Sequence, residues 1–237
     1  MQTTLAQFNE TQSTEAFALQ NSKLLKVSLN QVTIQAKLGS MVAYQGDVSF
    51  EHAGSGGLGR MLKKAVSGEG TSLMRMNGSG EVFLADQAQD IHLIYLESDT
   101  ITVNGPNLLA FDAGIDWDIH RLSGGTAGAM AGGLFNMGLT GTGWVAILSD
   151  GPPVLLNVAQ APTFADAQAA ITWSSGVTVG LKTDFKMKNL VGRGSGESIQ
   201  LAFQGQGWAL VQPSEGRIVP VSGGGSGGGG LGNLLGG

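Results

Sequence analysis

The sequence predicts an all-β protein built from three tandem units in a pseudo-threefold arrangement. Three observations support this prediction: a Gly-x-Gly motif that occurs three times, alternating apolar and polar residues on both sides of each copy, and 39 glycines in 237 residues. The motifs begin at Gly78, Gly141 and Gly205, which are 63 and 64 residues apart. Such alternation is typical of half-buried strands, and paired glycines mark bulges, kinks or tight turns between them.

The first strand of each unit follows the same pattern. Val27 in the first unit corresponds to Ile94 in the second, at an offset of 67 residues, and to Leu156 in the third, at a further offset of 62. In the first unit, residues 30–31 resemble a tight turn and residues 32–36 a returning strand, so we expect a hairpin there.

A second strand in each unit carries a large aromatic residue at the same offsets. These residues are Tyr44, Phe111 and Trp173. Their neighbours alternate between apolar and polar, so we expect all three side chains to be buried at equivalent positions of a shared core.

These offsets divide the chain into a lead-in, three β-units and a glycine-rich tail. The boundaries fall at residues 1–21, 22–88, 89–151, 152–220 and 221–237. Within each unit, the segment before the glycine motif varies in length; these segments are 53–68, 122–133 and 184–196. Variable loops on a repeated framework often carry the function, and the composition of the tail predicts a flexible segment.

Composition narrows the classes of function. A net charge of −5 and a pI near 5.1 argue against nucleic-acid binding, which needs clustered Lys and Arg. The absence of cysteine excludes disulfides, zinc–thiolate sites and thiol nucleophiles. Residues 1–20 lack the basic and apolar regions of a secretory signal, and no stretch is apolar enough to span a bilayer. We therefore expect a cytoplasmic protein, with attachment to the periphery of a membrane as a further expectation.

The sequence offers one weak candidate for a metal site. Asp116, Asp118 and His120 alternate on one face of a predicted strand, which suits metal ligands but suits a solvated outer face better. His52 and His92 do not form the His-x-His pair that a cupin-type metal site requires. No nucleophile elbow is present either. We therefore predict no catalytic, cofactor-binding or metal-binding residues, no cofactor, and no enzymatic activity.

Several segments resemble the altered-inheritance-of-mitochondria family of bacterial and mitochondrial proteins. These segments are residues 39–50, the glycine-rich stretch that follows up to Lys63, and the strands around the three Gly-x-Gly motifs. The resemblance implies three tandem units similar to the tryptophan RNA-binding attenuation protein (TRAP-like), a shortened double-stranded β-helix or β-sandwich. It implies no catalytic residue, and similarity of fold does not imply RNA binding. A mitochondrial member is associated with inner-membrane organisation.

Together these observations predict a non-enzymatic structural or interaction protein, a scaffold acting near a membrane surface. The alternative is a small-molecule-binding module with a pocket between β-units. Incomplete β-units expose strand edges that must be covered, so we expect a homo-oligomer, with a trimer as the first expectation.

The variable loops and the tail supply candidate contacts with a membrane surface or a protein partner. Their apolar and basic residues are Leu58, Arg60, Met61, Leu62, Lys63, Lys64, Met130, Leu134, Phe135, Leu231, Leu234 and Leu235. Leu58, Met61 and Leu62 have the spacing of one side of a short helix. The alternative is that these loops cap the β-core or are buried against another subunit.

Overall fold

The computed structural model describes residues 3–30, 32–52, 72–121, 135–182 and 200–214. Among these residues, every regular element is a strand apart from two short 3-10 helices, η1 (Leu5–Phe8) and η3 (Gly105–Asn107), which confirms the predicted all-β class. The strands are β1 (Phe17–Asn21), β2 (Leu24–Ser28), β3 (Ile34–Lys37), β4 (Met41–His52), β5 (Leu73–Leu84), β6 (Asp90–Asn104), β7 (Leu108–Asp112), β8 (Asp116–Arg121), β9 (Phe135–Ser149), β10 (Val154–Asn157), β11 (Thr163–Asp166), β12 (Ala170–Ser174), β13 (Val177–Lys182), β14 (Gln200–Gly205) and β15 (Trp208–Val211).

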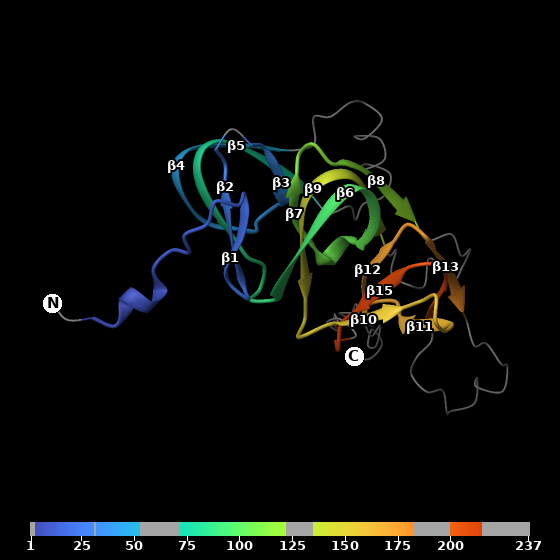
Figure 1. Cartoon of the computed structure of the whole chain (residues 1–237). Coiled ribbons are helices and arrows are strands. Elements are labelled where there is room, and N and C mark those ends of the chain that lie inside the picture. The colour runs from blue at the N-terminus through green and yellow to red at the C-terminus, as the bar shows by residue number, and fades with distance from the viewer. Residues whose placement is uncertain (1–2, 31, 53–71, 122–134, 183–199, 215–237) are drawn as a thin grey trace, which may run out of the picture.

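All strand pairs among the described residues are antiparallel, and they form two sheets. The larger sheet has the order β1-β2-β5-β3-β7-β9-β6-β12-β15-β10, with β4 paired to β5 and β8 paired to β9. The smaller sheet has the order β11-β14-β13. The molecule is elongated, with β4 at one end and β11 and β13 at the other (Figure 1).

In each third of the chain, the strands that contain or flank the glycine motif pair with other strands along both of their edges. β5 pairs with β4 along one edge and with β2 and then β3 along the other. β9 pairs with β6 along one edge and with β7 and β8 along the other. In the last third of the chain, β14 lies between β11 and β13, and β15 lies between β10 and β12.

The predicted hairpin at residues 30–36 is wrong. β2 and β3 do not pair with each other; they follow one another along the same edge of β5. Between them the Leu29 N–H donates to the Gly80 carbonyl, at 2.8 Å, so the chain bends at this point without reversing its direction.

The registers of these pairs recur at the intervals seen in the sequence. On one edge the opposed residues are Val27 and Val82, Ile94 and Val145, and Leu156 and Ala209. On the other edge they are Tyr44 and Val82, Phe111 and Val145, and Trp173 and Ala209. The strands β4, β7 and β12 also share a register shift, which lies between Met41 and Ala43, Leu108 and Ala110, and Ala170 and Thr172.

The first glycine of each motif adopts a backbone conformation that side chains disfavour. The φ angles of Gly78, Gly141 and Gly205 are 133°, 141° and 119°. A Cβ atom on Gly78 would lie 2.1 Å from the carbonyl oxygen of Asp47 on the facing strand. The positive φ angles show why glycine is needed at these positions. Gly78 and Gly141 nevertheless lie inside the continuous strands β5 and β9, not at a turn between two strands.

The core consists of three apolar clusters distributed along the molecule. Phe111 and Trp173 are buried in it, with exposed fractions of 0% and 4%, as predicted. Tyr44 is 50% exposed, so its predicted burial is wrong. The difference follows from the pairing: β7 and β12 each have strands on both edges, whereas among the described residues β4 pairs with β5 alone.

Candidate interaction surface

The predicted loop contacts fall almost entirely outside the described residues. This holds for Leu58, Arg60, Met61, Leu62, Lys63, Lys64, Met130, Leu134, Leu231, Leu234 and Leu235. Phe135 is the first residue of β9, and its side chain also lies outside the described part. The candidate interaction surfaces among the described residues therefore lie on the strands.

The first surface is the free edge of β4, which we define as residues 41–45. This stretch pairs with β5, and none of the described strands pairs with its other edge. Its side chains are exposed although several are apolar: the exposed fraction is 62% for Val42 and 50% for Tyr44. The Tyr44 ring packs edge-on against Phe50, with centroids 5.2 Å apart.

The second surface is the free edge of β11, residues 163–166. One edge of this strand pairs with β14, and within the described ranges no strand pairs with the other. Phe164 is 46% exposed, and Lys182 on β13 places its Nζ 4.4 Å from the centroid of the Phe164 ring.

Among the described residues, these two edges have little of the usual protection against pairing with another chain, although β4 has a register shift between Met41 and Ala43. Proteins shield exposed edge strands with charged side chains, proline, bulges or covering loops. Residues 41–45 carry no charge and no proline, and β11 carries one charge, on Asp166. An exposed apolar edge of this kind is a template for adding a strand.

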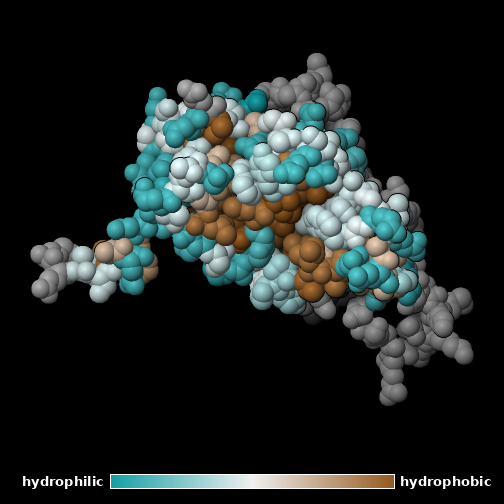
Figure 2. All heavy atoms as spheres, in the orientation of Figure 1, coloured by the Kyte–Doolittle hydropathy of each residue, from teal (hydrophilic) through white to brown (hydrophobic). Residues whose placement is uncertain are grey.

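Figure 2 shows a further hydrophobic region in the middle of the molecule, between its two ends. Two apolar residues of β10 are also exposed: the exposed fraction is 52% for Val154 and 63% for Leu155. The corresponding strand in the first third of the chain, β2, is covered by β1, which the sequence did not predict. Exposed apolar patches of this kind mark contact surfaces more often than catalytic ones.

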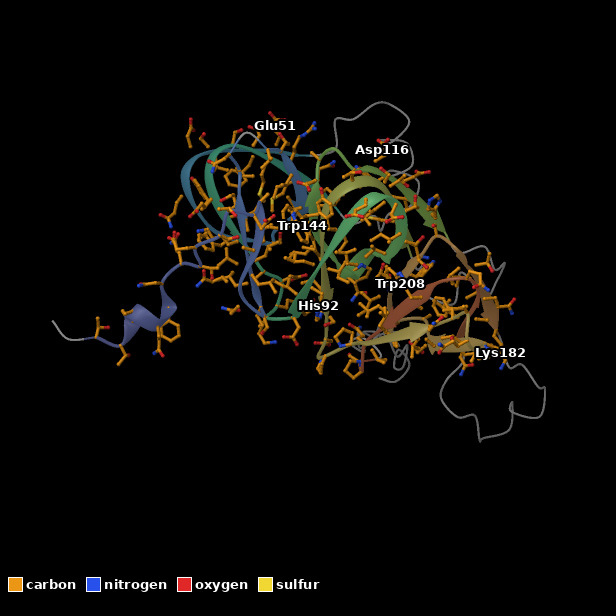
Figure 3. The ribbon with its side chains drawn as sticks, viewed as in Figure 1. Glu51, His92, Asp116, Trp144, Lys182 and Trp208 are labelled. Carbon is orange, nitrogen blue, oxygen red and sulfur yellow. The ribbon has the colours of Figure 1, made fainter. Side chains whose placement is uncertain are left out.

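The described polar residues do not gather into a reactive centre. Asp116, Asp118 and His120 are exposed on β8, as a solvated outer face requires. No group of three or more His, Asp or Glu residues in the described ranges is arranged to hold a metal ion. His92, Asp116 and Lys182 lie well apart in Figure 3.

The perturbed ionisable groups have structural partners. Burial lowers the pKa of His92, whose Nε2 lies 2.8 Å from the Ser149 hydroxyl. Burial raises the pKa of Asp112, and its carboxylate accepts a hydrogen bond from the Trp144 backbone N–H at 2.5 Å. At the corresponding place near the C-terminus, the Trp208 N–H donates to the Ser174 hydroxyl at 3.1 Å. Asp112 and Ser174 thus bind the backbone directly after the second glycine of the second and third motifs.

A buried ion pair holds the N-terminal segment against the sheet. Lys26 is 5% exposed, and its Nζ lies 2.7 Å from Glu81 and 3.4 Å from Glu10. The hydrogen bond with Glu81 raises the pKa of Lys26, so the lysine is charged at neutral pH. The alternation of apolar and polar residues does not predict this ion pair, because it predicts that Lys26 points into the solvent.

The sequence predicted exposed strand edges in general but did not locate them, and it placed Tyr44 in the core instead. The place of each unit in the repeat could have located these edges, because the terminal units of a repeat array lack a neighbour on one side.

Among the described residues, no helix has the length and hydrophobicity needed to cross a bilayer.

Comparison with solved structures shows the same fold in another protein. The chain is similar to a structural-genomics crystal structure of a Streptococcus pyogenes protein, with 22% sequence identity and a TM-score of 0.68. The match covers 84% of this chain and 92% of that one. At this identity the similarity is evidence for the fold alone.

Among curated protein sequences, none matches the chain. The family model described as mitochondrial biogenesis AIM24 matches residues 17–214. The chain therefore belongs to the AIM24 family.

Proposed function

We propose that this protein is a non-enzymatic interaction protein, a scaffold that acts through the free strand edges at its two ends. The observation that carries this proposal is the edge of β4, where Val42 and Tyr44 are exposed on a strand with an unpaired side among the described residues. Unpaired backbone donors and acceptors next to apolar side chains favour binding of a further strand over catalysis.

Under this proposal the chain consists of three tandem TRAP-like units with a pseudo-threefold relation. The recurring registers and the recurring shift in β4, β7 and β12 support this division. So does the positive φ angle at the first glycine of every motif. A chain of such units has two terminal units, and each of them leaves one edge without a neighbour.

The protein is expected to form a homo-oligomer, with a trimer as the expected state. Pairing of the free edges would remove both exposed strands from water and satisfy their backbone hydrogen-bonding groups. Multi-angle light scattering at tens of micromolar should give three times the 24.3 kDa chain mass. A monomer at that concentration would contradict the assembly and, with it, this proposal.

Action near a membrane surface is the second part of the proposal. The stretch with Leu58, Met61 and Leu62 between basic residues has the composition of a membrane-surface contact. Changing these three residues to serine should abolish co-flotation with anionic liposomes while leaving the melting temperature unchanged. The control variant changes Val154 and Leu155, which are exposed on β10, to serine and should still float. Unfolding of the triple variant would show instead that the stretch is structural.

A further inference from the structure

Two junctions inside the chain join strands in the same way. In the first, β3 pairs with β7 and Gln35 lies opposite Phe111. In the second, β6 pairs with β12 and Thr102 lies opposite Trp173. The flanking hydrogen bonds also correspond: the Ala113 N–H donates to the Thr33 carbonyl at 2.9 Å, and the Ser175 N–H donates to the Thr100 carbonyl at 3.2 Å. The residues of the second junction follow those of the first at the offsets of 67 and 62 found in the sequence.

Each junction completes a run of six strands. The first run is β4-β5-β3-β7-β9-β6, and the second is β8-β9-β6-β12-β15-β10. The ends of the chain hold two incomplete runs. One is β4-β5-β2, in which residues 41–45 of β4 form the outer edge, and the other is β13-β14-β11, in which β11 forms the outer edge.

We infer that β11 of one copy of this chain pairs with β4 of a second copy and completes a third run of six strands. Applying the same offsets places Phe164 opposite Tyr44, Ala165 opposite Ala43, and Thr163 opposite Gln45, in an antiparallel register. This inference rests on the proposed division into three units. It adds to the proposed homo-oligomer which two edges meet, β4 with β11, and the register of their contact.

The side chains at the two edges fit this pairing. Tyr44 and Phe164 are 50% and 46% exposed, whereas Phe111 and Trp173, which occupy the position of Tyr44 in the internal junctions, are buried. Joining the edges therefore gives Tyr44 the environment that its counterparts already have. Burial of two aromatic side chains is a large part of the stabilisation available to an interface.

The backbone fits as well. Pro162 of the third unit occupies the position of Thr33 and Thr100. In the internal junctions, these two threonines accept a hydrogen bond through the backbone carbonyl, which proline also has. The Gly46 N–H takes the place of the Ala113 and Ser175 donors. The two edges thus have complementary hydrogen-bonding groups in the register set by the internal junctions.

The contact is head-to-tail, because the two edges that meet are different. β4 and β11 lie at opposite ends of the molecule, so one chain in this conformation does not satisfy its own edges (Figure 1). A heterologous contact of this kind produces a ring when its rotation closes and a filament when it does not. In a ring, residues 41–45 of β4 and the outer edge of β11 are paired in every copy.

A disulfide trap tests the register directly, because the natural chain has no cysteine. Ala43→Cys and Ala165→Cys together place a cysteine on each edge at a non-hydrogen-bonded pair, where Cα atoms are about 4.5 Å apart, within the range for a disulfide. Mild oxidation should convert most of the chains to covalent multimers on a non-reducing gel. The matched control, Gln45→Cys with Ala165→Cys, is two residues out of register and should stay mostly uncrosslinked. Equal crosslinking of both pairs, or of neither, would overturn the register.

A mixing experiment tests the head-to-tail arrangement. Tyr44→Pro and Phe164→Pro each remove the outward N–H of one edge and should each give a folded monomer, with folding checked by circular dichroism. Mixed in equal amounts, they retain one intact β4 edge and one intact β11 edge, so they should form a dimer and nothing larger. A Phe164→Pro protein that keeps the mass of the wild type, or a mixture that stays monomeric, would overturn the contact.

The outcomes separate this inference from the proposed function. A wild-type oligomer whose mass is unchanged by both proline variants would leave the proposed assembly in place and remove this interface. A wild-type monomer would remove both. If either proline variant fails to fold, the disulfide trap still decides, because each alanine-to-cysteine change adds a single sulfur atom, at the exposed Ala43 and at Ala165, which is half-buried against the third core cluster.

Discussion

Replacing Phe111 with alanine is expected to lower the free energy of unfolding by about 3–5 kcal/mol, the usual cost of deleting a fully buried phenylalanine. Phe111 is 0% exposed, and β7, which carries it, pairs with β3 on one edge and β9 on the other. The substitution therefore leaves a cavity at the junction between the first and second thirds of the chain. Urea denaturation followed by circular dichroism measures the change.

The matched control for this variant is Leu155→Ala. Leu155 is 63% exposed on β10, so its truncation should change the free energy of unfolding by no more than about 0.5 kcal/mol. A cost below about 1.5 kcal/mol for Phe111→Ala would show that the junction is not a packed core, since even conservative truncations of a buried side chain reach that value.

The second large effect is expected from Gly78→Ala. The φ angle of Gly78 is 133°, where a side chain is strained, and a Cβ atom would lie 2.1 Å from the Asp47 carbonyl oxygen and 3.1 Å from the Cα of Val48. Both neighbours are backbone atoms of the paired strand, so they cannot move aside cheaply. We expect a loss of about 3 kcal/mol or more in the free energy of unfolding, measured by urea denaturation.

Gly39→Ala separates backbone strain from steric contact. Gly39 also has a positive φ angle, 85°, but no atom lies within 4 Å of a Cβ built there. Its substitution should cost about 1 kcal/mol, the backbone strain alone. Equal costs at Gly78 and Gly39 would show that the close approach of β4 to β5 is not what requires glycine in the motif.

The spacing of the sequence predicted the strands well because side-chain alternation is a local property. Val27, Ile94 and Leu156 lie opposite residues that are themselves related by the intervals between the glycine motifs. The same reasoning could not predict the burial of Tyr44. Burial of a strand residue depends on which strands pair beside it, and β4 has a described neighbour on one edge only.

The local sequence pattern also gave a wrong prediction near residue 30, where it indicated that the chain reverses its direction. Turn-forming residues after an apolar strand favour a hairpin, but here the following strand continues along the edge of β5. The choice between reversing and continuing is made by the long partner strand, which lies more than forty residues further along the sequence. For the candidate site, composition predicted apolar loop contacts that lie outside the described residues, and the strand edges became visible only from the order of the sheets.

Hydrogen–deuterium exchange of the β4 edge is the most direct measurement of the head-to-tail contact. In the wild-type assembly the outward amides of Tyr44 and Gly46 should exchange slowly, because the edge is paired with β11 of the neighbouring copy. In Phe164→Pro the same amides should exchange at least tenfold faster, although position 164 lies at the opposite end of the same chain (Figure 1). Fast exchange of the Tyr44 and Gly46 amides in the wild type at tens of micromolar, or slow exchange that Phe164→Pro leaves unchanged, would contradict the contact.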